Sequence, residues 1–206
     1  MIKLGDWQAP CSLGIVPNSV MDVFQGEKVD GVLGMNFIKN YAVSFCSQKK
    51  QVQFFASSNT TINRQNTYDL SGLGFNAAKA VQMIKGEDNL YSIEAILNGT
   101  IKCGFIIDSG AYMSQLSKRC AMQLGLPLDG VTRQQSFLFG EVFLLNGKLK
   151  EILVGQTKIA EVIVDYPKTD PSDSLPPLLG MDIFNRYRMF WDFPNSLMYM
   201  EKYSKK

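Results

Sequence analysis

The sequence predicts an all-β fold, and three observations in residues 90–112 lead to this prediction. Every second side chain from Tyr91 to Leu97 is apolar, which is the period of a strand with one buried face. Asn98-Gly99 follows, and this dipeptide favours the positive φ angles of a tight hairpin turn. Residues 105–107 are then an unbroken apolar run, which is typical of a buried strand. Together the two runs and the turn predict a β-hairpin.

A carboxylate stands directly at the end of the second predicted strand. Asp108 is followed by Ser109, whose hydroxyl can donate or accept a hydrogen bond, and by Gly110, which lets the backbone approach a bound group closely. A buried strand that ends in an acidic side chain holds that side chain in a fixed position for chemistry. The alternative is structural: an Asp that caps a turn after a strand, with the glycine supplying the bend.

A second element lies further along the chain. Residues 178–184 join an apolar leucine pair to Gly180 and then to a predicted short helix. Alone, this pattern indicates a buried strand followed by a helix start. After a strand, turn, strand and D-S-G-A, however, it resembles the retropepsin-like (retroviral-type) aspartic proteases, in which the two motifs occur in this order. The resemblance covers residues 68–206.

The resemblance implies a fold and a chemistry. The fold is a closed β-barrel lobe, and the activity is that of an aspartic endopeptidase in which Asp108 activates a water molecule. Ser109 would brace the carboxylate by a hydrogen bond, and Gly110 and Ala111 would complete the active-site loop close to the water. Gly180 would let a crossing strand pack beneath this loop. The expected partners are peptide or protein substrates, with no cofactor and no metal.

Residues 134–145 predict a further hairpin, with its tip near Phe139, Gly140 and Glu141. In a retropepsin-like lobe this hairpin is the flap that closes over a bound peptide. An ordinary surface hairpin is the alternative interpretation.

Two other segments carry local signals. Residues 117–126 predict a helix with Ser117 as its N-cap and Gly125 at its end. Residues 75–85 fit either a short helix or an opening strand.

The composition excludes several other mechanisms. The 206 residues include no histidine, so Ser-His-Asp and Cys-His catalysis would lack a base. The four cysteines show no C-x-x-C spacing, which argues against a zinc site.

A net charge of +2 gives no argument for a nucleic-acid partner. No apolar run approaches the length of a membrane span, and residues 1–6 lack the regions of a signal peptide. In a hydrolase of this composition, carboxylates are the expected acid and base.

The chain also contains an internal repeat. Residues 32–41 align without a gap with residues 178–187, and both segments place Leu-Gly-Met before a shared tyrosine. We therefore predict three parts: residues 1–56 as the distal half of a first, truncated retropepsin-like lobe, 57–67 as a polar linker, and 68–206 as a complete lobe.

The predicted chemistry needs two aspartates that share one proton, whereas the sequence contains a single D-S-G motif. Three possibilities stay open. A second copy of the lobe could supply the partner in a homodimer. A first lobe of the same chain could supply it from upstream of residue 1. In the third case the partner is absent, and the fold is an inactive module for peptide binding or assembly. Asp182, expected to cap a helix or to interact with the helix dipole, and Asp192 are predicted to be non-catalytic.

Overall fold

The computed structural model describes residues 2–4, 7–9, 32–56, 68–130, 132–137, 140–169 and 175–203. Within these ranges the chain consists mainly of β-strands, with a few short helices, so the all-β prediction is confirmed. None of the helices described here is long and apolar enough to cross a membrane. The predicted linker at 57–67 and the predicted flap residue Phe139 lie outside the described residues.

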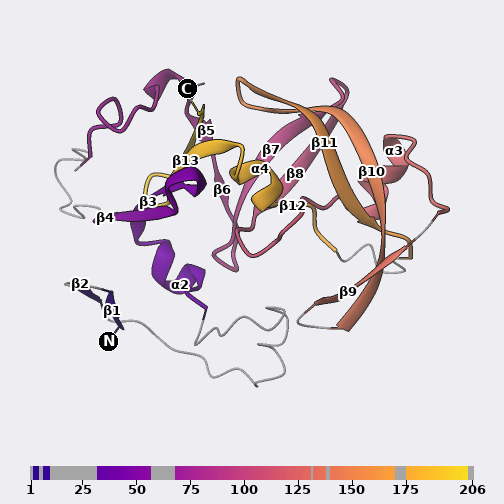
Figure 1. Ribbon diagram of the computed structural model, residues 1–206, viewed down its shortest axis with the longest axis horizontal. Coiled ribbons are helices and arrows are strands. Elements are labelled where there is room, and N and C mark those ends of the chain that lie inside the picture. The colour runs from indigo at the N-terminus through magenta and orange to yellow at the C-terminus, as the bar shows by residue number, and fades with distance from the viewer. Residues whose placement is uncertain are drawn as a thin grey trace.

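The larger sheet has seven strands and contains the predicted hairpin (Figure 1). Its order is β11-β10-β7-β8-β12, with β6 also paired to β7 and β9 to β10. The strands are β6 (Ile84–Lys85), β7 (Tyr91–Leu97), β8 (Ile101–Ile107), β9 (Arg133–Phe137), β10 (Gly140–Val154), β11 (Thr157–Pro167) and β12 (Leu178–Leu179). Asn98 and Gly99 join β7 to β8 with φ angles of 48° and 75°, as the predicted turn requires.

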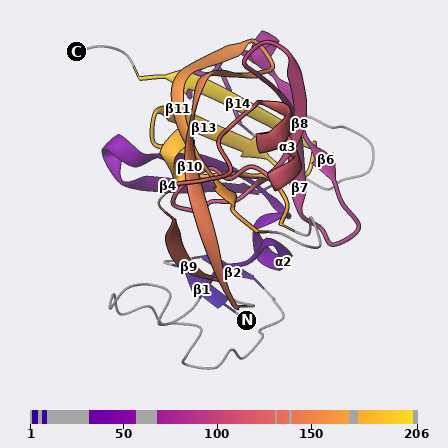
Figure 2. The same ribbon diagram turned by 90° about the vertical axis from the view of Figure 1, so that its right-hand side faces the viewer.

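A second sheet brings together strands from both ends of the described chain. Its order is β4-β3-β13-β14-β5. The strands are β3 (Tyr41–Cys46), β4 (Gln51–Ala56), β5 (Val81–Gln82), β13 (Tyr187–Asp192) and β14 (Leu197–Lys202). Seen from the side, β13 and β14 run across behind β10 (Figure 2). Strands β1 (Ile2–Leu4) and β2 (Trp7–Ala9) form a separate two-stranded sheet.

The apolar core lies between the two larger sheets. Val43 of β3, Ile93 of β7 and Met189 of β13 belong to the same buried cluster. Their neighbours Ala42 and Phe190 point to the opposite face of the second sheet, where they form a smaller buried cluster. This core contains side chains from β3 and from strands that follow residue 68, so residues 41–56 pack as one body with the described residues from 68 to 203.

The helices are short and sit at the ends of strands. They are α2 (Met35–Ile38), α3 (Lys118–Gln123), α4 (Met181–Phe184) and two 3-10 turns, η2 (Ser47–Lys49) and η3 (Ala77–Lys79). Ser117 caps α3 as predicted, since its Oγ accepts a hydrogen bond from the Cys120 amide at 3.2 Å. Residues 75–85 contain both of the elements considered for them, η3 and then β5.

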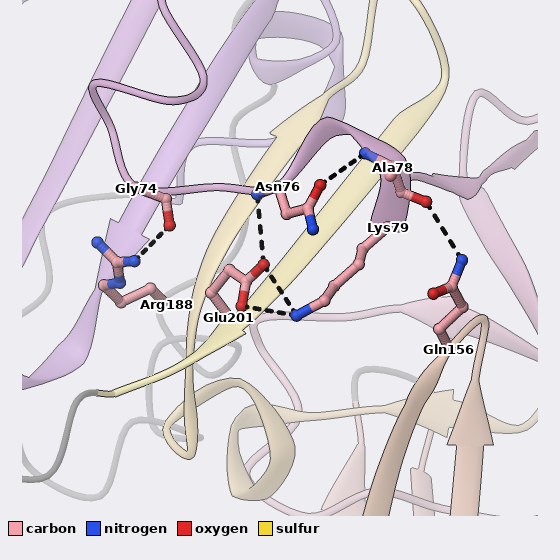
Figure 3. Close-up of polar contacts among 7 residues, drawn as sticks. All are labelled: Gly74, Asn76, Ala78, Lys79, Gln156, Arg188 and Glu201. Atoms are coloured by element: carbon pink, nitrogen blue, oxygen red, sulfur yellow. Dashed lines mark hydrogen bonds and ion pairs between the residues drawn. The ribbon is translucent and has the colours of Figure 1, made fainter.

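The segment after the predicted linker is fastened to the outside of the second sheet (Figure 3). Arg188 of β13 donates to the Gly74 carbonyl at 2.5 Å. Glu201 of β14 accepts from the Asn76 amide at 3.3 Å and pairs with Lys79 at 3.1 Å. These contacts fix residues 74–79 where they lead into β5.

Elements at the two ends of the described chain correspond residue by residue. The separation in sequence between α2 and α4 equals the separation between β3 and β13 and the separation between β4 and β14. Both hairpins keep the same register, with Tyr41 opposite Ala56 and Tyr187 opposite Lys202. Between β3 and β4, Lys50 has a φ of 51°, and its counterpart Ser196 has a φ of 54°.

Candidate active site

Asp108 stands where β8 leaves the sheet. Its amide donates to the Leu179 carbonyl at 3.0 Å, because β8 and β12 run parallel with Ile107 opposite Leu179. Its carboxylate Oδ1 accepts a hydrogen bond from the Gly110 amide at 2.8 Å. The side chain of Asp108 is half-buried, whereas Ser109 and Gly110 are exposed. The core thus anchors the backbone of Asp108 and leaves its carboxylate at the surface.

The hydrogen bond predicted from Ser109, within the lobe or across a lobe interface, stays a prediction. Among the described residues, the hydrogen bond to the Asp108 carboxylate comes from the Gly110 amide, and none comes from the Ser109 hydroxyl. The loop closes on itself through the Ala111 amide, which donates to the Asp108 carbonyl at 3.2 Å. Backbone groups therefore set the shape of the D-S-G-A turn.

Gly180 packs against the backbone of this loop. A Cβ atom at Gly180 would lie 2.7 Å from the Ala111 carbonyl oxygen and 2.9 Å from the Met113 carbonyl carbon. A hydrogen bond further joins these two segments, because the Met181 amide donates to the Ala111 carbonyl at 2.8 Å. Only a residue without a side chain allows this approach, so the geometry agrees with the crossing expected at Gly180.

A serine and a buried carboxylate join the loop to α4. Asp182 Oδ1 accepts hydrogen bonds from the Ser114 amide at 2.8 Å and the Ser114 hydroxyl at 2.7 Å. The Ser114 oxygen in turn accepts from the Gly180 amide at 3.0 Å. The expectation that Asp182 caps its own helix is therefore wrong: the N-cap position is Gly180, without a side-chain cap, and the Asp182 carboxylate binds the loop. Asp182 does lie in the first turn of α4, so the expected interaction with the helix dipole stays a prediction.

The environment of Asp182 favours its neutral form. Burial raises the pKa of this carboxyl group, while the hydrogen bonds from Ser114 and the charge of Arg186 act in the opposite direction. Oδ2 of Asp182 is buried and has no hydrogen-bond partner among the described residues. Ser114 was not singled out from the sequence, because one serine after a D-S-G-A turn matches no spacing rule.

The chain leaving the loop is held between two strands. Gln115 exchanges backbone hydrogen bonds with Leu178 of β12 at 2.8 and 2.9 Å. On its other side, the Ser114 carbonyl accepts from the Asp165 amide of β11 at 2.9 Å, and Leu116 donates to the Asp165 carbonyl at 2.8 Å. Both ends of the loop are therefore fixed to the seven-stranded sheet.

Asp192 has a structural environment. It lies in β13, is 2% exposed, and accepts hydrogen bonds from the Tyr68 hydroxyl and from Asn195. Burial and the Asp192 carboxylate raise the pKa of Tyr68, so its hydroxyl stays a donor. In the described ranges, no group of three or more His, Cys, Asp and Glu side chains is placed to hold a metal ion.

The predicted flap segment forms a hairpin. β9 pairs with the beginning of β10, with Gly140 opposite Phe137 and Glu141 opposite Ser136. This hairpin projects below the rest of the sheet in Figure 1. Its backbone therefore agrees with a flap, and that role stays a prediction.

Comparison with known proteins gives a match to a family and likenesses to solved structures, of which two are described here. The family model described as gag-polyprotein putative aspartyl protease matches residues 93–186, a span that includes Asp108 and Gly180. A search of curated proteins gave no match. A retropepsin-like aspartic protease from Rickettsia conorii is 23% identical with a TM-score of 0.46, covering 58% of this chain and 97% of its own. EIAV protease complexed with the inhibitor HBY-793 is 17% identical with a TM-score of 0.37, covering 49% and 90%. Residues 93–186 of this chain are therefore similar to the gag-polyprotein aspartyl protease family.

Proposed function

We propose that this chain is part of an aspartic endopeptidase and that Asp108 is one of its two catalytic carboxylates. The observation that carries the proposal is the placement of Asp108 at the end of a core strand, with its carboxylate at the surface and one oxygen held by the Gly110 amide. A carboxylate oriented in this way can accept a proton from a water molecule that attacks a peptide carbonyl.

The surrounding contacts supply the rigidity that this chemistry needs. Two carboxylates close together do not both ionise readily, so one keeps a proton and polarises the substrate while the other acts as base. This division of roles depends on a fixed separation between them. The Gly180 crossing and the bonds between Ser114 and Asp182 support such a separation, because they tie the loop to β12 and α4.

We further propose that the second carboxylate belongs to a first lobe of the same protein, of which residues 1–56 are the distal half. The matching hairpins support this proposal, and so does the way they meet. β3 pairs with β13 in antiparallel orientation, with Ser44 opposite Phe190, and these two residues are counterparts in the repeat. Counterparts that face each other define a local twofold axis, as between the subunits of a symmetric dimer. β3 therefore occupies the edge of β13 that an identical lobe would need.

Peptide cleavage tests the role of Asp108, and it is measured on a protein that contains the proposed first lobe together with residues 1–206, because the proposed site needs both carboxylates. We expect cleavage of a peptide library, followed by mass spectrometry across acidic to neutral pH, and inhibition by a statine-type compound. Asp108→Asn keeps the size of the side chain and removes the base, so the rate should fall by about 10²-fold or more. Glu94→Gln is the matched control, because Glu94 is an exposed carboxylate on the adjacent strand β7. An active Asp108→Asn variant would refute the assignment. Peptide binding without cleavage by the wild type would favour the inactive module.

Mixing the wild type with Asp108→Asn tests the source of the second carboxylate. If both carboxylates come from one chain, activity per wild-type molecule stays constant as the variant is added. If two identical lobes share one site, mixed dimers form, and activity per wild-type molecule falls with the fraction of variant. The second result would overturn the single-chain arrangement and leave the role of Asp108 intact.

A further inference from the structure

We propose that Cys103 and Cys120 are a dithiol site that forms a reversible disulfide around the active-site loop. Their sulfur atoms are 2.9 Å apart, and neither residue is in a disulfide in this structure. A disulfide bond is about 2.05 Å long. The two sulfurs therefore need to approach by less than an ångström, on the order of a small side-chain rotation.

The two cysteines sit on elements that already pack together. Cys103 is a buried core residue of β8, and Cys120 is a half-buried residue of α3. They are 17 positions apart in the sequence, and the segment between them contains Asp108 and Ser114. A bond between them would close a covalent ring around the loop that carries the proposed catalytic carboxylate.

The exposure of the two thiols decides the order of the chemistry. Cys120 is the more accessible, so its thiolate would attack a small disulfide such as oxidised glutathione and release one molecule of glutathione. Cys103 would then lose its proton, attack the Cys120 sulfur of the mixed disulfide and release the second glutathione. The hydrogen bond with Cys120 and burial both raise the pKa of Cys103, so the second step should become faster as the pH rises. Two thiols are oxidised and one glutathione disulfide is reduced, so the reaction balances.

The bond would act mainly on stability. Closing a ring of this length restricts the unfolded chain, and the ratio of folded to unfolded protein should rise by about 100-fold. This effect does not depend on peptidase activity, so it can be measured whether or not the chain cleaves peptides.

The test uses the folded 206-residue protein equilibrated in a series of buffers in which the ratio of oxidised to reduced glutathione increases. Differential alkylation followed by peptide mapping should show a link between Cys103 and Cys120 that dithiothreitol removes. Urea unfolding of the oxidised and reduced forms should show the roughly 100-fold difference in the folded-to-unfolded ratio. The Cys120→Ala variant should lose both the link and the difference. The matched control is Cys46→Ala, because Cys46 ends β3 in the other sheet and should leave both unchanged.

Three results would overturn the proposal. One is that both thiols remain alkylatable across the whole range of buffers in the folded protein. Another is that mapping links Cys103 to a cysteine other than Cys120. The third is that the link forms in Cys46→Ala and the wild type only after the protein has been unfolded in urea.

Discussion

Gly180→Ala is the substitution whose cost follows most directly from the geometry of the site. The added methyl carbon would lie 2.7 Å from the Ala111 carbonyl oxygen, whereas ordinary contacts begin at 3.4 Å. The loop must therefore move by about 0.7 Å, and it is backbone that has to move. The same shift stretches the hydrogen bond from the Met181 amide to that carbonyl. Overpacking of this kind costs about 1–3 kcal/mol, and a weakened hydrogen bond about 1 kcal/mol.

Urea unfolding measures this cost, and two other glycines provide controls. We expect Gly180→Ala to lower the free energy of unfolding by about 2–3 kcal/mol and the urea midpoint by about 1 M. Gly34 is the repeat counterpart of Gly180, and among the described residues a methyl group there meets only the Asn36 side chain, at 3.2 Å. Gly104 lies in β8, and a methyl group there has no neighbour within 4 Å in the described part of the chain. Gly104→Ala should be neutral or stabilising by up to about 1 kcal/mol.

The refuting result concerns the difference between these variants. If Gly180→Ala unfolds within about 0.5 kcal/mol of both the wild type and Gly34→Ala, the close crossing does not constrain the loop. The support that we infer for Asp108 would then need another source. A large loss in Gly34→Ala as well would show that both glycines are required for the start of their helices and not for the crossing.

Two further predictions concern other contacts of the lobe. Burial raises the pKa of the Asp182 carboxyl group, so this group stays protonated in the folded state at a pH where it has lost its proton in the unfolded chain. The free energy of unfolding therefore falls as the pH rises from about 4 through the raised pKa. Asp182→Asn places at this position the residue type of the repeat counterpart Asn36. In urea unfolding, the stability of this variant relative to the wild type should increase between pH 4 and pH 7. A stability difference between the two proteins that does not change with pH would contradict this. Arg188→Ala removes hydrogen bonds to the carbonyls of residues 73 and 74 and should cost about 1–3 kcal/mol by thermal unfolding, whereas Lys102→Ala, in an exposed ion pair, should cost under about 1 kcal/mol. Equal losses would contradict the role of Arg188.

The part of the site that could be predicted from the sequence depends on local signals. Alternation, an Asn-Gly turn and an apolar run are features of neighbouring residues, so they predict β7, the turn and β8 with Asp108 at the end. The N-cap of α3 at Ser117 follows in the same way, since a cap bond joins residues three apart. Where the physics is local, the prediction and the structure agree.

The part that could not be predicted depends on contacts between distant segments. Ser114 and Asp182 lie 68 positions apart, and each alone fits several roles. Asp182 has the position of a helix cap by its local sequence, yet two hydrogen bonds from the loop determine where its carboxylate points. Cys103 and Cys120 likewise show no motif spacing, and only the packing of α3 on β8 brings them together.

The pairing of β3 with β13 shows what an alignment of two similar segments can and cannot predict. An alignment of residues 32–41 with 178–187 predicts two similar hairpins, and it is silent on whether they touch. The need to pair strand edges explains why the two hairpins touch. Without β3, one edge of β13 would be exposed, and an exposed edge strand tends to pair with another chain. The hairpin of β3 and β4 belongs to the same chain, so it is present at high effective concentration, and β3 pairs with β13 in a symmetric register, with Ser44 opposite Phe190. If the two hairpins are copies of one lobe element, as we propose, the covalent link between them replaces the association step that a homodimer requires.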